Sequence, residues 1–167
     1  MTMNVNPKNN LIDEPVRLWL AEDISSLSAD IAAGTGLVFD YSYTSTAKGE
    51  TATDPCGFRA NRVKLVTAAG GDFAGVLAQP VKKKKGATTG CYVYVSKPGS
   101  VCRIQASAAV AALGNKLVCS KNAASLGKFV AATTETGAGV AVALQTSTGA
   151  GVILAKLYEG DQNGLKA

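Results

Sequence analysis

The chain has 167 residues and a mass of 17.0 kDa, which is enough for one ordinary domain with a real core and too little for two full-sized domains. Hydrophobic residues make up 47% of the sequence, but 27 of them are alanines and aromatic residues make up only 6%, so burial has to come from thin layers of small side chains. The sequence contains no histidine, which excludes Ser-His, Cys-His and histidine–metal chemistry.

The net charge of +5 is unevenly distributed along the chain. Residues 1–60 carry 4 basic and 8 acidic side chains, residues 61–129 carry 11 and 1, and residues 130–167 carry 2 and 3. The middle segment is therefore a basic block, which suits nucleic acid, an anionic protein surface or water alone. No stretch approaches the ~18 apolar residues of a membrane-spanning helix, so we expect no membrane partner.

The four cysteines contain no C-x-x-C pair, and no histidine is present to complete a zinc set. The first ten residues are polar and lack the apolar core of a secretory signal. We therefore expect free thiols in a reducing cytoplasm, with no metal and no cofactor. The cysteines are Cys56, Cys91, Cys102 and Cys119.

Residues 1–20 begin polar and then become amphipathic around Pro15. The proline interrupts any helix and favours extended chain before it. This pattern predicts an extended N-terminal arm that either pairs with its own sheet or docks onto a neighbouring chain. The candidate contacts to a neighbouring chain or a sister subunit are the apolar side chains Leu11, Ile12, Val16, Leu18, Trp19 and Leu20.

The next segment allows two interpretations. Ile24, Leu27 and Ile31 recur at i, i+3 and i+7, and Gly34 follows them, which indicates one short helix. Serine and aspartate in the same stretch favour an irregular loop instead. We therefore expect residues 1–30 to form the arm with a short helix or loop, and residues 31–167 to form a β-domain.

From residue 36 onward, short runs rich in β-branched residues alternate with Gly, Pro, Ser, Thr and Asn clusters. This pattern predicts an all-β, mainly antiparallel fold: a small β-sandwich or barrel of about eight strands. Residues 44–60 and 121–136 are expected to be surface loops. The expected strands lie within residues 37–43, 62–67, 73–79, 91–95, 101–106, 116–120, 140–144 and 152–158.

Two hairpins are expected. The sequence Thr-Gly-Ala-Gly-Val occurs at 136–140 and again at 148–152, and we interpret the two copies as the starts of two paired strands. A second hairpin is expected around Pro98, which would place Tyr94 opposite Cys102 and put Tyr92 and Tyr94 in the core. Cys91 would then lie on the other face, which disfavours a Cys91–Cys102 disulfide.

Four consecutive lysines, Lys82, Lys83, Lys84 and Lys85, form a candidate basic contact loop. Such a run suits a localisation signal or a phosphate-contacting loop, but also a solvated loop that discourages edge-to-edge aggregation. No stacking aromatic flanks it, which favours the solvated or protein-facing loop. The carboxylates occur as adjacent pairs or, at Asp72, singly after two glycines, so we expect no catalytic residue.

The strand-forming sequences at Gly75–Ala78, Gly139–Leu144 and 151–157 resemble those of the head decoration, or capsid cement, proteins of tailed bacteriophages. The resemblance covers mainly residues 72–158, and more weakly 30–39; residues 1–30 and the four-lysine loop have no counterpart in it. It implies a β-rich protein without catalytic residues that braces the major capsid protein, commonly as a homotrimer. Its expected location is the outer surface of the virion, after passage through the host cytoplasm during assembly.

The expected function is thus that of a non-enzymatic viral structural protein that stabilises an assembled capsid by bridging its subunits. The alternative is a nucleic-acid-binding β-barrel that uses the basic segment 61–129. A carboxylate enzyme centred on Asp72 is a third and weaker hypothesis.

Overall fold

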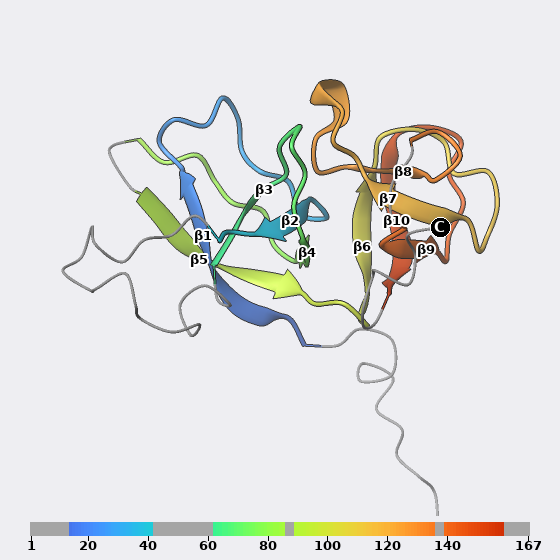
Figure 1. Ribbon diagram of the computed structural model, residues 1–167, viewed down its shortest axis with the longest axis horizontal. Coiled ribbons are helices and arrows are strands. Elements are labelled where there is room, and N and C mark those ends of the chain that lie inside the picture. The colour runs from blue at the N-terminus through green and yellow to red at the C-terminus, as the bar shows by residue number, and fades with distance from the viewer. Residues whose placement is uncertain (1–13, 42–61, 86–88, 136–138, 159–167) are drawn as a thin grey trace, which may run out of the picture.

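The structure is a computed structural model that describes residues 14–41, 62–85, 89–135 and 139–158. In this part of the chain there are ten strands and no α-helix, arranged as two barrels side by side (Figure 1). Among the same residues there is no helix of the length and apolar character needed to cross a membrane.

The N-terminal barrel closes in the order β1-β3-β2-β4-β5, with β5 pairing back onto β1. Only β1 and β3 are parallel. Its inward side chains alternate along each strand with outward ones, so Leu18 and Leu20 point into the core while Arg17 and Trp19 point out. The strands are β1 (Val16–Asp23), β2 (Gly36–Phe39), β3 (Arg62–Leu65), β4 (Phe73–Leu77) and β5 (Thr89–Ser96).

The C-terminal barrel closes in the order β10-β6-β8-β7-β9, with β9 pairing back onto β10. Here only β6 and β8 are parallel. A short 3-10 helix, η2 (Ala123–Ser125), lies between β7 and β8. The strands are β6 (Val101–Ala106), β7 (Lys116–Cys119), β8 (Phe129–Ala131), β9 (Ala141–Ala143) and β10 (Gly151–Leu157).

The two barrels have the same topology. When each barrel's strands are numbered one to five, both close in the order 1-3-2-4-5, and both have their single parallel pair between strands one and three. The register also matches: Leu37 of β2 faces Gly75 of β4, as Leu117 of β7 faces Ala141 of β9. The chain is therefore a tandem repeat of one five-stranded barrel.

Hydrogen bonds outside the strands repeat in the same way. Gly34 N donates to Leu77 O at 2.7 Å, and Gly114 N donates to Ala143 O at 2.9 Å. A bridge between Ile31 and Val81 in the first barrel has its counterpart between Val110 and Ser147 in the second. Ala78 N donates to Tyr94 O, and Leu144 N donates to Leu154 O, at 2.8 and 2.9 Å. These pairs identify equivalent residues of the two barrels at the positions that they join.

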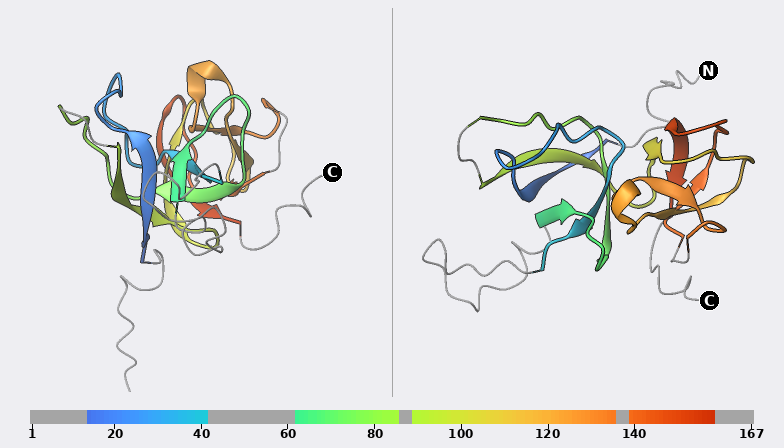
Figure 2. Two further views of the ribbon diagram at one scale, coloured as in Figure 1. Left: turned by 60° about the vertical axis from the view of Figure 1, so that its left-hand side comes forward. Right: turned by 90° about the horizontal axis from the view of Figure 1, so that it is seen from above.

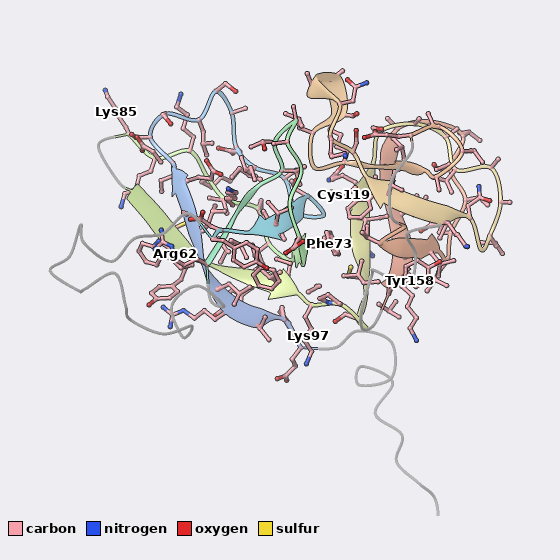
Figure 3. All side chains as sticks on the ribbon, in the orientation of Figure 1. Arg62, Phe73, Lys85, Lys97, Cys119 and Tyr158 are labelled. Carbon is pink, nitrogen blue, oxygen red and sulfur yellow. The ribbon has the colours of Figure 1, made fainter. Side chains whose placement is uncertain are left out.

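The barrels meet through the segment that leads into β2. Gly34 O accepts a hydrogen bond of 2.9 Å from Gln105 N on β6, and Gly36 N donates to Gly127 O at 2.7 Å. Phe73 of β4 packs edge-on against Phe129 of β8, with ring centroids 6.2 Å apart, and belongs to the core cluster of the C-terminal barrel. Figure 3 labels Phe73 where the two barrels meet, and the right-hand view of Figure 2 shows the two barrels meeting as seen from above.

The prediction of an all-β fold is confirmed, and each of the eight expected strand segments overlaps a strand. The expectation of one barrel or sandwich is wrong, because the strands divide into two closed barrels. Two strands add to the expected eight: β8 lies in a stretch expected to be a surface loop, and β1 lies in the expected arm.

The segment after β1 is a loop, so its helical spacing of apolar residues was misleading. Asp23 ends the strand by accepting hydrogen bonds from Ser25 N at 2.9 Å and Ser25 Oγ at 2.6 Å, which fold the chain into a turn. The hydrogen bond from the Ser25 hydroxyl lowers the pKa of Asp23. Ile24 and Ile31 belong to this loop and are buried, although the loop is not helical.

One expected hairpin is confirmed and the other is wrong. Strands β9 and β10 pair antiparallel, with Ala143 opposite Ala155. Strands β5 and β6 do not pair, because residues 97–100 carry the chain from the first barrel into the second. Cys102 is consequently a core residue of the C-terminal barrel, while Tyr92 and Tyr94 lie on the outside of the N-terminal one.

Candidate contact surfaces

The apolar residues predicted to make contacts do not form one exposed arm. Leu18 and Leu20 are buried in the core of the N-terminal barrel, which corrects their assignment as partner contacts, and Val16 packs against that core. The reason is the alternation of side chains along β1, whose inner row supplies the barrel. Trp19 lies on the outer row, and Leu11 and Ile12 lie outside the described residues.

An outward surface on β1 and β5, here called the aromatic face, consists of Arg17, Trp19, Tyr92 and Tyr94. Arg17 lies opposite Tyr94 and Trp19 opposite Tyr92 in the strand register. Tyr92 is 60% exposed and Tyr94 45% exposed, so the prediction that they belong to the core is wrong. Large aromatic side chains left this open are available for contact.

The aromatic face is held in shape by its own side chains. The Trp19 and Tyr92 rings meet edge to face, with centroids 4.9 Å apart and planes at 85°. The Arg17 guanidinium lies 4.0 Å above the Tyr92 ring centroid, in a cation–π contact. Gly90, with φ +78°, leaves room for the indole, because a Cβ there would collide with Trp19. The face is therefore built before any partner arrives.

Beside this face, two cations are paired with a buried carboxylate. Asp40 is 4% exposed and lies 3.7 Å from Arg62 and 3.8 Å from Lys64. Figure 3 labels Arg62 on the N-terminal barrel. Because a buried carboxylate neutralises much of the charge of both neighbours, the outward surface of β3 offers less free positive charge than its sequence suggests.

A second surface, here called the leucine tip, is formed by Leu113 and Leu144 of the C-terminal barrel. Leu113 is 68% exposed and Leu144 43% exposed. They lie near each other because Gly114, next to Leu113, donates to the carbonyl of Ala143, next to Leu144. Leu113 precedes β7 and Leu144 follows β9. These two strands lie on the right-hand side of Figure 1, whereas β1 and β5 lie on the left.

An open groove of about 550 Å³ runs between the barrels. Its N-terminal side is made of small residues before β2 and after β4, and its C-terminal side of outward residues of β6 and β10. Gln105 bridges it: its side-chain Nε2 donates to Ala33 O at 2.8 Å. The residues that line the groove include Ala33, Gly34, Ala78, Arg103, Gln105 and Val152.

The predicted basic contact loop, Lys82 to Lys85, is exposed as expected for a solvated loop. Lys82 Nζ donates to Asp30 Oδ2 at 2.8 Å, and the backbone of Lys83 donates to Asp30 Oδ1 at 2.8 Å. The hydrogen bond from Lys82 lowers the pKa of Asp30. Figure 3 shows Lys85 at the end of the N-terminal barrel away from the C-terminal one. The loop is thus not part of the aromatic face.

The polar clusters serve local structure. Ser120, fully buried after β7, donates to Glu135 Oε2 at 2.6 Å, and Glu135 Oε1 accepts from Lys121 N at 2.8 Å. This carboxylate fastens the loop that leads to η2. In the part of the chain that the structure describes, no group of three or more Cys, Asp or Glu side chains is placed to hold a metal ion.

The three described cysteines are free thiols, and Cys56 lies outside the described residues. Burial raises the pKa of Cys102 and of Cys119 to about 12, and Glu135 contributes to the shift at Cys119. Burial also raises the pKa of Cys91. Since the thiolate is the reactive form, the raised pKa lowers the reactivity of all three thiols, and burial also shields Cys102 from reagents.

We therefore expect Cys102 and Cys119 to resist alkylation in the folded protein. At pH 8 a thiol with a pKa near 12 is ionised in only about one molecule in ten thousand. Iodoacetamide labelling followed by peptide mass mapping measures this, with guanidinium-unfolded protein, in which all 4 cysteines react, as the control. Native labelling of Cys119 at the unfolded rate would contradict the burial described above.

No protein-family model matches the chain, and no curated protein matches it.

The aromatic face was missed from sequence because Tyr92-Val93-Tyr94-Val95 alternates two apolar rows, either of which could face inward. The hydroxyl groups could have indicated which row faces outward. The row of Tyr92 and Tyr94 carries two phenols, whereas the other row carries valines, which fit a barrel interior better.

Proposed function

We propose that this protein is a non-enzymatic structural protein that decorates an assembled bacteriophage capsid and braces its subunits. The observation that carries the proposal is the coincidence of the resemblance with the fold: the sequences that resemble capsid cement proteins form β4, β9 and β10, which are strands of both barrels. The likeness therefore concerns the framework of the molecule and not a peripheral loop.

The distribution of side chains supports the same proposal. Exposed aromatic and leucine side chains on rigid strands and tight turns suit a protein that works by contact, since Trp, Tyr and Arg dominate the energetics of protein interfaces. Many modest contacts repeated over a symmetric lattice give strong retention without any single tight site. The major capsid protein is the proposed partner, and a homotrimer the proposed assembly.

The nucleic-acid alternative has less support. Binders of single strands combine a charged groove with aromatic side chains whose faces are open to bases. Here Arg17 covers one face of the Tyr92 ring, and Asp40 pairs with both Arg62 and Lys64. The hydrogen bonds described for the four-lysine loop go to Asp30 and to the carbonyl of Ile24, not to these aromatics.

We expect the purified protein to sediment with capsids that lack it and to raise the temperature at which those capsids break open. Pelleting and a heat-release assay measure the two effects. A fluorescent single-stranded oligonucleotide tested at low salt is the comparison, because phosphate contacts weaken steeply as salt rises. Tight oligonucleotide binding together with no capsid binding would overturn the proposal in favour of the nucleic-acid function.

A further inference from the structure

Within one molecule, the tip of the N-terminal barrel contacts the strand face of the C-terminal barrel. Within one chain, the residues before β2 and after β4 of the N-terminal barrel face the outward row of β6 and β10 across the groove. Gly34 and Ala33 make the direct hydrogen bonds, both to Gln105. This junction is a head-to-tail contact, because it joins the tip of one barrel to the strand face of the next.

The repeat register identifies the equivalents of both sides. Gln105 lies opposite Val152 and Arg103 opposite Leu154 in the C-terminal barrel, as Trp19 lies opposite Tyr92 and Arg17 opposite Tyr94 in the N-terminal one. The aromatic face is therefore the N-terminal barrel's version of the strand face that lines the groove. Within the described chain, no barrel tip faces it.

The tip has its equivalents as well. The hydrogen bonds of Gly34 and Gly114 make Leu113 the counterpart of Ala33, and those of Ala78 and Leu144 make Leu144 the counterpart of Ala78. Ala33 and Ala78 line the groove at the junction. Their counterparts on the C-terminal barrel, Leu113 and Leu144, are exposed, as are Tyr92 and Tyr94 of the aromatic face.

The distribution of exposed apolar side chains fits these two surfaces. The described residues include seven large hydrophobic side chains that are exposed, and four of them belong to the aromatic face or the leucine tip. The four are Tyr92, Tyr94, Leu113 and Leu144. The pairing of leucine with tyrosine and tryptophan gives an apolar interface core of the kind that carries binding energy.

We propose that the leucine tip of a second copy of this chain docks on the aromatic face, repeating between molecules the contact that joins the barrels within one. Arg17 fits this arrangement because its equivalent, Arg103, lines the intramolecular groove. Each copy presents one face and one tip, so the contact is heterologous and closes into a ring when the rotation between copies permits it.

Two blocked variants of the full chain test this proposal. Leu113→Asp with Leu144→Asp blocks the tip, and Tyr92→Thr with Tyr94→Thr blocks the face. Both pairs change exposed side chains, so both variants should still fold, which urea unfolding checks. Leu126→Asp is the matched control, because Leu126 is an exposed leucine outside both surfaces. Light scattering behind size-exclusion chromatography gives the mass of each.

We expect the unmodified protein and the Leu126 control to form the same discrete oligomer at micromolar concentration. Each blocked variant should be monomeric, with self-association weakened by at least about tenfold. An equimolar mixture of the two blocked variants should give a one-to-one dimer and nothing larger, because one intact face and one intact tip remain. A symmetric face-to-face contact cannot give that result.

Three results would overturn the proposal: an unmodified protein that is monomeric throughout the concentration range, blocked variants that assemble like the control, or a mixture that stays monomeric. A face-blocked variant that assembles normally but loses capsids or an oligonucleotide would assign the face to that partner instead. The mass measurements use no capsids, so a failure of self-association leaves the proposed capsid binding standing, and a failure of capsid binding leaves this contact standing.

Discussion

Replacing Phe129 by alanine should lower the free energy of unfolding by about 3–5 kcal/mol, the range for removing a buried aromatic ring from a packed core. Phe129 is fully buried and is the largest such side chain in the described protein. Its ring meets Phe73 at right angles across the barrel junction, so the cavity left behind opens both onto the C-terminal core and onto its contact with the other barrel.

Urea unfolding at a fixed low protein concentration measures this loss, since association would otherwise add to the apparent stability. Phe129→Leu is the matched control: it keeps most of the apolar volume and should cost clearly less. Phe73→Ala, made alone and with Phe129→Ala, tests the coupling, because two side chains in contact should not have additive effects. An alanine variant within 1 kcal/mol of the unmodified protein would contradict the packing of Phe129.

Strand positions were predictable from this sequence because alternation and turn residues are local signals. Residues 101–106 were expected as a strand and form β6 with the same bounds. Strand β8 was missed because its three residues follow a polar stretch, and three residues are too few for alternation to be recognised. Its pairing with β7 and β6 depends on residues distant in the sequence, which no local pattern encodes.

The division into two barrels was not predictable by the same means. A turn sequence such as Lys97-Pro98-Gly99 favours a hairpin, yet here it links two closed barrels, because β5 already has β1 and β4 as neighbours. The repeat is only weakly visible in the sequence: Gly34 and Gly114 each precede a Leu-Val pair by three residues, at Leu37 and Leu117. Substitutions elsewhere, such as Asp40 where the other barrel has Ser120, hide it.

The contact surfaces, too, were predictable only as far as local sequence patterns determine them. The amphipathic character of residues 16–20 was evident from sequence, but which row would face outward depended on the barrel that β3 and β5 complete around β1. The outer row proved to be Arg17 and Trp19, and the residues opposite them, Tyr94 and Tyr92, come from a strand some seventy residues away.

Replacing Gly34 by alanine should destabilise the protein far more than the same replacement at Gly114. Both glycines have positive φ, +88° and +79°, so both variants incur the cost of about 1–2 kcal/mol for a left-handed backbone with a side chain. At Gly34 a Cβ would also lie 2.9 Å from Gln105 N and 3.0 Å from the carbonyl carbon of Ile104, whereas at Gly114 no atom lies within 4 Å.

The obstacle at Gly34 is backbone of the other barrel, so no side chain can turn aside, and relief requires the barrels to separate. This should add about 1–3 kcal/mol, the range for overpacking, and should weaken the hydrogen bond that Gly34 O accepts from Gln105. The difference between the two variants, measured by urea unfolding, is then the cost of disturbing the junction alone, since the left-handed strain cancels. Equal losses at the two positions would mean that the barrels are not held together through Gly34.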